Sequence, residues 1–455
     1  MAELAPRLAA RSLSPVDLCQ TLLRRCDRLE PILNAFITLD PARVLAEARV
    51  AEGELSAGRS RGPLHGVPVA VKDLCWTRGE RTTGGSRVFG GFVPEEDASV
   101  VARLRAAGAI VFGKTNTPEF AYGPLNAYHY GPSRNPWDPT RFTGGSSMGA
   151  AAALAGGLVP AALGSDTGGS IRAPAHWSGV TGLKPTYGRV PLRGVVPLAT
   201  TLDHVGPMTR SALDAALLLQ VMAGHDPLDP TSADVPVPDY ARETARPARG
   251  LRVGVPRGYL WDLVAPAIGA AVEAALEELR RLGVTVEDVT IPEWEAAADA
   301  SHVLIRSEAA TEYRTLLAER PRDLIPEVRE RLEAGVRTSA VEYLEARRAS
   351  DRLAHALRRL LARADVLALP GRSQTAPRMD GDGRLLEPLS PRNHTAPLNY
   401  AGVPALTVPC GFDGEKLPIG IQLVGPHWAE GTLFQVAHAY QQATDWHRRR
   451  PPLCG

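Results

Sequence analysis

The stretch GGSSMGAAAALAGGLVPAALGSDTGGSIRAPA, Gly144–Ala175, carries the tripeptide Gly-Gly-Ser twice, at Gly144–Ser146 and at Gly168–Ser170. Between them, the alanine-rich run Gly149–Gly157 predicts a tightly packed helix, and Leu158–Gly164 predicts a buried strand. A helix and a strand allow the chain to leave and return, so both glycine turns can meet at one edge of a sheet. The pattern therefore indicates a site where the backbone approaches a ligand closely and hydroxyl groups take part in chemistry.

The second turn, DTGGS (Asp166–Ser170), can point successive backbone N–H groups into a concave anion site. A nucleotide phosphate is one ligand for such a site, but no GxGxxG motif follows a predicted strand in this chain. The other use is an oxyanion hole beside a nucleophile. Ser170 directly follows the two glycines and is the predicted nucleophile.

A serine nucleophile needs a base, and lysine is conspicuously rare here. Only four of the 51 basic residues are lysine. Lysine can lose its proton when it is desolvated, whereas arginine cannot. Lys72 ends the apolar run Val67–Asp73, which predicts a buried strand with Lys72 at its carboxyl end. The histidines remain alternative bases: His65, His129, His176 and His204.

Strand and helix patterns alternate along the chain and predict an α/β fold with a mixed central sheet. Further strands are expected at Ala109–Lys114, Gly250–Pro256, Val284–Ile291, Asp365–Pro370, Ala405–Phe412 and Pro418–Gly425. Helices are expected near Ala265–Leu282, over much of Ala296–Ala364, and at Glu430–Ala443.

Several segments of the chain resemble the amidase signature family. The matching segments are GPLHGVPVAVKD (Gly62–Asp73), GKTNTPEF (Gly113–Phe120), GPSRNPWDPTR (Gly131–Arg141), the stretch Gly144–Ala175, GVTGLKPTYGRV (Gly179–Val190), LDHVGPMTRS (Leu202–Ser211) and PLNYAGVPALTVPCGF (Pro397–Phe412). The resemblance implies the amidase-signature fold, a large mixed central sheet flanked by helices. It predicts a single amidase domain over 1–455, with a motif-rich core at 62–225 and 395–445 and a more variable helical part at about 240–365.

The resemblance also implies a Ser–cis-Ser–Lys triad that cleaves amides through an acyl-enzyme. Carried over by position, Ser170 is the nucleophile, Ser146 the serine after a cis peptide bond, and Lys72 the base. The implied oxyanion hole consists of the backbone N–H groups of Thr167, Gly168, Gly169 and Ser170. Asp166 and Arg172 are expected to support the nucleophile loop. The other interpretation of Arg172 is that it binds a carboxylate of the substrate. No metal and no cofactor are implied.

The substrate is predicted from aromatic residues. Tyr122, Tyr128 and Tyr130 cluster in one loop-like segment, and Trp177 follows the nucleophile closely. Met148 and His176 depart from the family pattern and are further candidates for the substrate pocket, with core packing as the other interpretation. An aromatic-lined cleft suits aryl or apolar groups. We therefore expect hydrolysis of aryl or apolar amides, with aryl esters and carbamates (urethanes) as additional substrates.

Two other functions remain open. Much of the first half also resembles the glutaminase subunit of a tRNA-dependent amidotransferase. Two features favour a stand-alone amidase: Leu332–Arg348 lacks the LG…LSxGYYD pattern expected there, and Arg392 stands where an acid is expected. The other possibility is a non-catalytic binding protein on the same fold, which the three intact triad positions disfavour.

The net charge, the cysteines and the N-terminal sequence indicate which partners and which cellular compartment to expect. Lys plus Arg total 51 and Asp plus Glu total 50, so the formal net charge is +1 and nothing favours a nucleic acid or an anionic membrane. The five cysteines have irregular spacing without a CxxC pair. The N-terminus lacks the apolar run of a secretory signal. We expect a cytoplasmic monomer or homodimer that binds a small-molecule amide, ester or carbamate, without nucleic acid or membrane.

Overall fold

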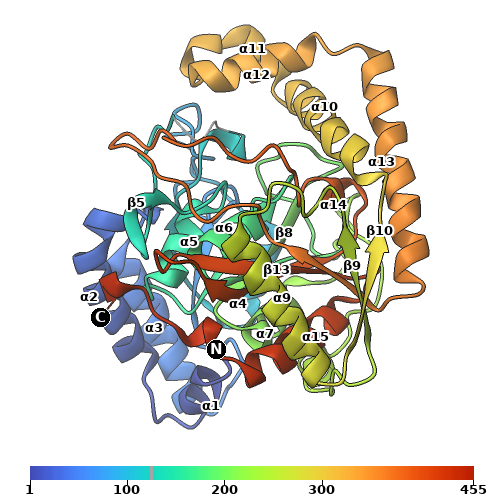
Figure 1. Ribbon diagram of the computed structural model, residues 1–455. Coiled ribbons are helices and arrows are strands. Elements are labelled where there is room, and N and C mark those ends of the chain that lie inside the picture. Colours follow the sequence, from blue (N-terminus) through green and yellow to red (C-terminus); the bar gives the residue numbers. More distant parts are fainter. Residues whose placement is uncertain (123–126, 455) are drawn as a thin grey trace.

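The computed structural model describes residues 1–122 and 127–454, and the centre of this part is a mixed sheet of eleven strands (Figure 1). Its strands are β1 (Phe36–Thr38), β2 (Pro68–Lys72), β3 (Ile110–Thr115), β6 (Ala161–Asp166), β7 (Thr181–Lys184), β8 (His204–Thr209), β9 (Arg252–Arg257), β10 (Thr285–Thr290), β11 (Val366–Pro370), β12 (Ala405–Phe412) and β13 (Pro418–Val424). Their order across the sheet is β1-β3-β2-β6-β8-β7-β12-β13-β11-β9-β10. A separate hairpin pairs β4 (Arg134–Asn135) with β5 (Asp138–Phe142).

Helices cover both faces of this sheet (Figure 1). They are α1 (Leu4–Ala9), α2 (Pro15–Leu33), α3 (Pro41–Ser56), α4 (Ser99–Ala106), α5 (Met148–Ala155), α6 (Arg172–Ser178), α7 (Ala212–Met222), α8 (Tyr240–Thr244), α9 (Pro266–Arg281), α10 (Trp294–Glu312), α11 (Arg314–Glu319), α12 (Pro326–Val336), α13 (Ala340–Leu361), α14 (Pro397–Tyr400) and α15 (Glu430–Ala443). Short 3₁₀ turns lie at η1 (Glu119–Ala121), η2 (Pro321–Asp323), η3 (Trp446–Arg448) and η4 (Pro452–Cys454).

The pairing confirms the predicted mixed sheet. Strands β3, β2 and β6 run parallel to one another, as do β11, β9 and β10, and antiparallel pairs join the two groups. The predicted strands at Ala405–Phe412 and Pro418–Gly425 and the helix at Glu430–Ala443 correspond to β12, β13 and α15. Strands β7 and β8, in the middle of the sheet, were not predicted. Gly182, Gly206 and Pro207 interrupt their sequences, and such residues usually mark turns.

The alternation of side chains along β2 explains where Lys72 lies. Val69 and Val71 pack into the core with Val100 of α4, whereas Ala70 packs into the opposite core with Ala151 of α5. Because successive strand residues point to opposite faces, Lys72 follows Ala70 toward α5. All residues of α5 are buried, and their small side chains let neighbouring elements pack closely against the helix, as predicted for this alanine-rich run.

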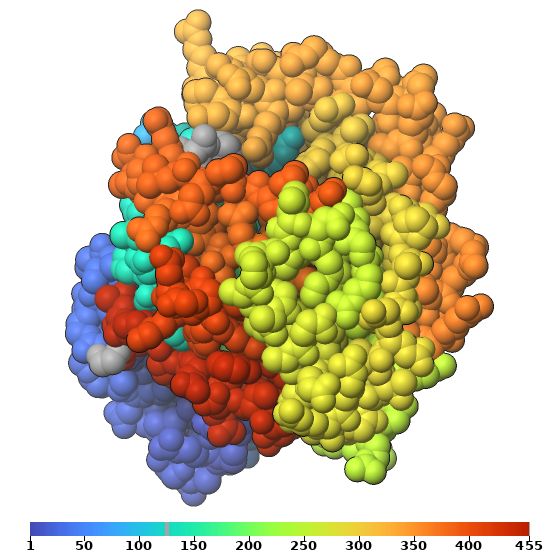
Figure 2. Space-filling view, viewed as in Figure 1, coloured from blue at the N-terminus to red at the C-terminus, as the bar shows by residue number. Residues whose placement is uncertain are grey.

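Helices α10 to α13 form a helical extension at one end of the molecule (Figure 2). They occupy the variable part expected at about 240–365. Helix α13 begins at a capping box in which the Ser339 side chain and Glu342 bind each other's backbone N–H groups. Helix α10 packs against α12 and α13 and returns toward the sheet, where it contributes to the cavity described below. Within residues 1–122 and 127–454, none of the helices combines the length and apolar character needed to cross a membrane.

Candidate active site

Lys72 lies at the centre of a buried cluster of hydroxyl groups. Its Nζ is 2.7 Å from Ser146 Oγ, 2.8 Å from Ser165 Oγ and 3.0 Å from Ser147 Oγ. The Gly145–Ser146 peptide bond is cis, as the resemblance implied. Ser147 and Ser165 were not predicted. They adjoin Ser146 and Asp166 in sequence, and both buried hydroxyl groups accept a hydrogen bond from Lys72.

Burial sets the protonation of this lysine. The side chain is fully buried, and this desolvation lowers the pKa of Lys72 to about 7, although Cys75, Asp166 and Asp203 partly oppose the shift. A substantial fraction of Lys72 is then neutral at neutral pH. A neutral amine can accept a proton from Ser146 Oγ at the distance observed.

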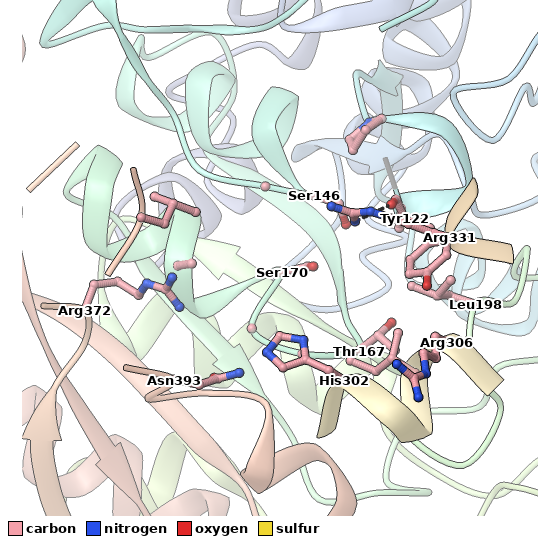
Figure 3. Close-up of a pocket in the computed structure, with 18 of the residues that line it drawn as sticks. Tyr122, Ser146, Thr167, Ser170, Leu198, His302, Arg306, Arg331, Arg372 and Asn393 are labelled. Carbon is pink, nitrogen blue, oxygen red and sulfur yellow. Dashed lines mark hydrogen bonds between the residues drawn. The ribbon is translucent and has the colours of Figure 1, made fainter. Parts of the chain in front are cut away.

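Ser170 lies in the same cavity as Ser146 (Figure 3). The main-chain carbonyl of Ser170 accepts a hydrogen bond of 3.1 Å from the N–H of Ser147, which ties the two Gly-Gly-Ser turns together. Among the described residues, Ser170 Oγ has no hydrogen-bond partner, so the hydroxyl is available to a ligand. The two turns therefore meet at one edge of the sheet, as predicted.

A buried ion pair holds the nucleophile loop. Arg172 donates to both carboxylate oxygens of Asp166, through Nη2 at 2.9 Å and Nε at 3.0 Å. Arg172 also donates to the carbonyl of Thr395 and the side chains of Asn399 and Gln422. The Arg172 contact keeps the pKa of Asp166 well below its usual range, although burial opposes this shift. Of the two interpretations of Arg172, the geometry agrees with support of the loop.

The loop amides differ in part from the expected oxyanion hole. The N–H groups of Thr167, Gly168 and Ser170 donate to none of the described residues. The N–H of Gly169, however, donates to Asp166 Oδ1 at 2.7 Å. Three of the four expected amides are thus free to bind a ligand, and Gly169 instead anchors the turn to the carboxylate.

Gly169 is the position where a side chain would disturb the site most directly. Its φ is +125°, and an added Cβ would lie 2.2 Å from Thr395 Oγ1. We expect Gly169→Ala to displace the loop, and with it the free N–H groups of Gly168 and Ser170. The variant should lower kcat/KM for amides by about 10²- to 10³-fold, the usual effect of losing one oxyanion donor. Gly269→Ala, in α9 with open space around it, is the matched control and should retain activity. Amide turnover and thermal melting of both variants test this expectation, and normal turnover in Gly169→Ala would contradict it.

The cavity has a volume of about 640 Å³ and opens above Ser146 and Ser170 (Figure 3). Its floor consists of Gly145, Ser146 and the loop Thr167–Ser170. Apolar walls come from Tyr122, Ala173, Trp177, Leu198, Ile305 and Leu389. The polar part of the lining consists of His302, Arg306, Arg331, Arg372, Ser390, Arg392 and Asn393.

Only two of the predicted substrate-binding side chains line this cavity, namely Tyr122 and Trp177. The Tyr130 hydroxyl donates to the carbonyl of Ser86 at 3.4 Å, outside the cavity. The ring of Tyr128 lies next to Gly383, and Tyr128 does not line the cavity. Tyr128 and Tyr130 are therefore close to Tyr122 in sequence but do not line the cavity with it.

Met148 and His176 also lie outside the cavity. Met148 is buried as the first residue of α5, in agreement with the packing interpretation. The His176 ring accepts from the N–H of Gly420 through Nδ1 at 3.0 Å, and burial lowers the pKa of His176 to about 3. His176 is therefore a neutral core residue and not a candidate base.

Sequence reasoning missed His302, Arg306, Arg331, Arg372 and Asn393. His302 and Arg306 are four residues apart on α10 and therefore share one helix face. Arg372 follows β11 by two residues. These positions lie 132 to 223 residues beyond Ser170 in the sequence, so only the tertiary structure places them around it.

Two short patterns in the chain take on other roles in the structure. GAIVFGKT (108–115) satisfies the GxxxxGK[ST] phosphate-loop pattern, yet Ile110–Thr115 is strand β3 and Lys114 pairs with buried Asp73 at 3.2 Å. GSSMG (145–149) satisfies the GxSxG nucleophile pattern around Ser147. The Ser147 hydroxyl is instead buried against Lys72 and the carbonyl of Ser165. Neither pattern therefore marks a second site.

The site combines a buried lysine, a serine after a cis peptide bond and a second serine at the end of a glycine loop. The model of the Amidase family matches residues 17–434. The chain belongs to the amidase signature family. It is therefore a hydrolase of the amidase class, whose members act on carbon–nitrogen bonds.

Comparison with individual proteins adds detail. A glutamyl-tRNA(Gln) amidotransferase subunit of Chloroflexus aurantiacus is 42% identical over 475 residues, covering 98% of this chain and 96% of the relative. A chain from a vestigial protein complex linked to the origins of an s-triazine catabolic enzyme superimposes with a TM-score of 0.90 at 35% identity, covering 97% of this chain and 98% of that one. Peptide amidase from Stenotrophomonas maltophilia gives 0.85 at 34% identity, covering 99% and 97%.

These relatives overturn the expected partners. We predicted a small-molecule substrate without nucleic acid, and this prediction was wrong. Curated relatives that match almost the whole chain are named as one of the subunits of an amidotransferase for glutamyl-tRNA(Gln). The prediction rested on a formal net charge of +1, and net charge describes the chain as a whole without reporting the complexes in which a subunit works.

Proposed function

We propose that this protein hydrolyses a carboxamide through an acyl-enzyme on Ser170. Neutral Lys72 accepts a proton from Ser146, which in turn accepts the proton of Ser170 as Ser170 Oγ attacks the amide carbon. The free N–H groups of Thr167, Gly168 and Ser170 stabilise the oxyanion. Ser146 then returns a proton to the leaving nitrogen, ammonia departs, and water releases the acid. The 2.7 Å contact between Lys72 and Ser146 beside the cavity supports this assignment.

We further propose that this activity serves an amidotransferase, with glutamine as the amide and glutamyl-tRNA(Gln) as the eventual acceptor of the nitrogen. The observation that carries this proposal is the 42% identity to the Chloroflexus amidotransferase protein over 98% of the chain. It replaces the expectation of a stand-alone amidase, although Arg392 occupies the position where an acid was expected. Arg392 lines the cavity and pairs with Asp262 and Glu295 at its exposed edge.

Cleavage of aryl or apolar amides, with aryl esters and carbamates, is the second candidate. One observation favours it: Tyr122, Trp177, Leu198 and Ile305 give the cavity an apolar wall. The same cavity carries four arginines, which suit such substrates poorly. For this reason glutamine is the first candidate.

Release of ammonia from glutamine and release of 4-nitroaniline from a 4-nitroanilide, measured at matched substrate concentration, test these candidates. The purified chain should release ammonia from glutamine, and glutamyl-tRNA(Gln) with the remaining amidotransferase subunits should accelerate the release. Faster cleavage of the anilide, with no response to tRNA or to those subunits, would reverse the order of the two candidates. A catalytically silent chain under both conditions would favour the binding-protein hypothesis.

A further inference from the structure

The polar lining of the cavity is strongly cationic. It contains four arginines and no aspartate or glutamate among the described residues. Arg372 lies on one side of Ser170, and Arg306 and Arg331 lie on the other (Figure 3). A cavity lined by one sign of charge concentrates ligands of the opposite sign. The substrate of this site is therefore expected to carry a negative charge.

Three of these arginines already have partners in the protein. The contacts are Arg306 Nη2 to Glu342 at 3.9 Å and Nε to Thr338 at 3.0 Å, Arg331 Nη1 to the carbonyl of Tyr122 at 3.1 Å, and Arg392 to Asp262 at 3.4 Å and to Glu295 at 3.2 Å. Arg372 differs from all of them. It forms no hydrogen bond and no ion pair with any residue in 1–122 or 127–454.

The position of Arg372 is nevertheless well defined. The preceding residue, Gly371, donates its N–H to the carbonyl of Gly420 at 2.9 Å, which fixes the backbone at the end of β11. The guanidinium carbon lies 5.0 Å from the centre of the Trp177 ring. The Trp177 indole N–H donates to the carbonyl of Gln374 at 2.8 Å, so ring and arginine are tied to the same segment. These contacts fix the position of the guanidinium, and its N–H donors remain free to bind a ligand.

The charge of Arg372 persists in this place. Burial and the nearby Arg172 lower the pKa of Arg372 to about 10, which leaves the side chain cationic at neutral pH. The carboxylate of Asp166 pairs with Arg172 through both of its oxygens and forms no ion pair with Arg372. A partly buried cation without a protein counter-ion is costly, and an anion bound in the cavity would relieve that cost.

We propose that Arg372 binds a carboxylate at the acyl end of the substrate, so that this site selects amides that carry a negative charge. The planar guanidinium matches a carboxylate through two parallel hydrogen bonds. Trp177 supports the guanidinium from its face and leaves its edge to the ligand. This inference rests on the acyl-enzyme chemistry proposed above and assigns the residue that recognises the acyl group. In glutamine the group bound would be the α-carboxylate.

Two amides of equal length test this proposal. Glutaramate is glutamine without its α-amino group, and pentanamide replaces its carboxylate by a methyl group. Arg372→Gln should lower kcat/KM for glutaramate by about 10- to 100-fold and change kcat/KM for pentanamide by less than about two-fold. Arg372→Lys should recover part of the loss. Arg378→Gln is the matched control, since Arg378 lies in the same segment, faces Glu387 and Glu415, and does not line the cavity.

If Arg372 merely supports Trp177, the Gln variant will lose activity toward both amides equally, and the proposal is overturned. Calorimetric titration with glutarate is independent of turnover and of the proposed reaction. Glutarate should bind the unmodified protein, 1,5-pentanediol should not, and Arg372→Gln should weaken glutarate binding at least ten-fold. Equal binding of glutarate by both proteins would overturn the proposal even if amides are hydrolysed. Glutarate binding without any amide hydrolysis would instead refute the acyl-enzyme reaction and leave the anion site supported.

Discussion

Replacement of Ser170 by alanine should abolish amide hydrolysis, with a loss of about 10⁶-fold in kcat, the scale seen when a nucleophilic serine is removed. The Ser170 hydroxyl faces the cavity without a hydrogen-bond partner among the described residues, whereas Ser146, Ser147 and Ser165 are all engaged by Lys72. Of these four serines, Ser170 is therefore the one placed to attack a substrate carbonyl.

Covalent labelling by a fluorophosphonate, with mass spectrometry of the labelled peptide, separates this expectation from a general loss of structure. The label should fall on Ser170 in the unmodified protein and be absent from Ser170→Ala. Ser390→Ala changes another serine that lines the same cavity and should be labelled normally. Residual labelling or turnover in Ser170→Ala would show that another residue is the nucleophile.

Replacement of Lys72 by arginine should lower kcat/KM by about 10²- to 10⁴-fold, the range that a positioned general base contributes. Arginine keeps the positive charge but cannot be deprotonated, so it cannot accept the proton of Ser146. Lys416→Arg is the matched control, because Lys416 lies in an exposed turn between β12 and β13. Near-normal turnover in Lys72→Arg would exclude Lys72 as the base.

The pH dependence of the unmodified protein follows from the same group. Burial lowers the pKa of Lys72 to about 7, and the reactive form is the neutral amine. Therefore kcat/KM should be low at acid pH, rise ten-fold per pH unit below the pKa, and reach a plateau at about pH 8. Measurement of kcat/KM from pH 5 to 9 tests this profile. A rate that is constant over this range would contradict a titrating base with this pKa.

The residues of the proposed triad could be predicted because they lie in short, local patterns. Lys72 follows a run of buried β-branched residues, and Ser146 and Ser170 each end a Gly-Gly-Ser turn. The rarity of lysine was also informative. Three of the four lysines, Lys72, Lys114 and Lys184, are fully buried, and only Lys416 lies at the surface.

The substrate pocket could not be predicted in the same way. Tyr122, Tyr128 and Tyr130 are close in sequence, but only Tyr122 reaches the cavity. A loop turns its successive side chains in different directions, so neighbours along the chain need not face one ligand. The expectation of apolar substrates rested on this cluster, and the arginines that change it come from elsewhere in the chain.

The amino-acid sequence by itself determined the amidase signature family, the mixed sheet and the residues of the proposed triad, because glycine turns, strand ends and buried lysine leave strong local patterns. Only the tertiary structure decided what surrounds Ser170. It brings α10, α12 and the segment after β11 over the nucleophile loop, and it leaves Arg372 on Trp177 without a counter-ion among the described residues. The physical reason is that charge complementarity in a cavity depends on distances between remote segments, and no local pattern encodes those distances.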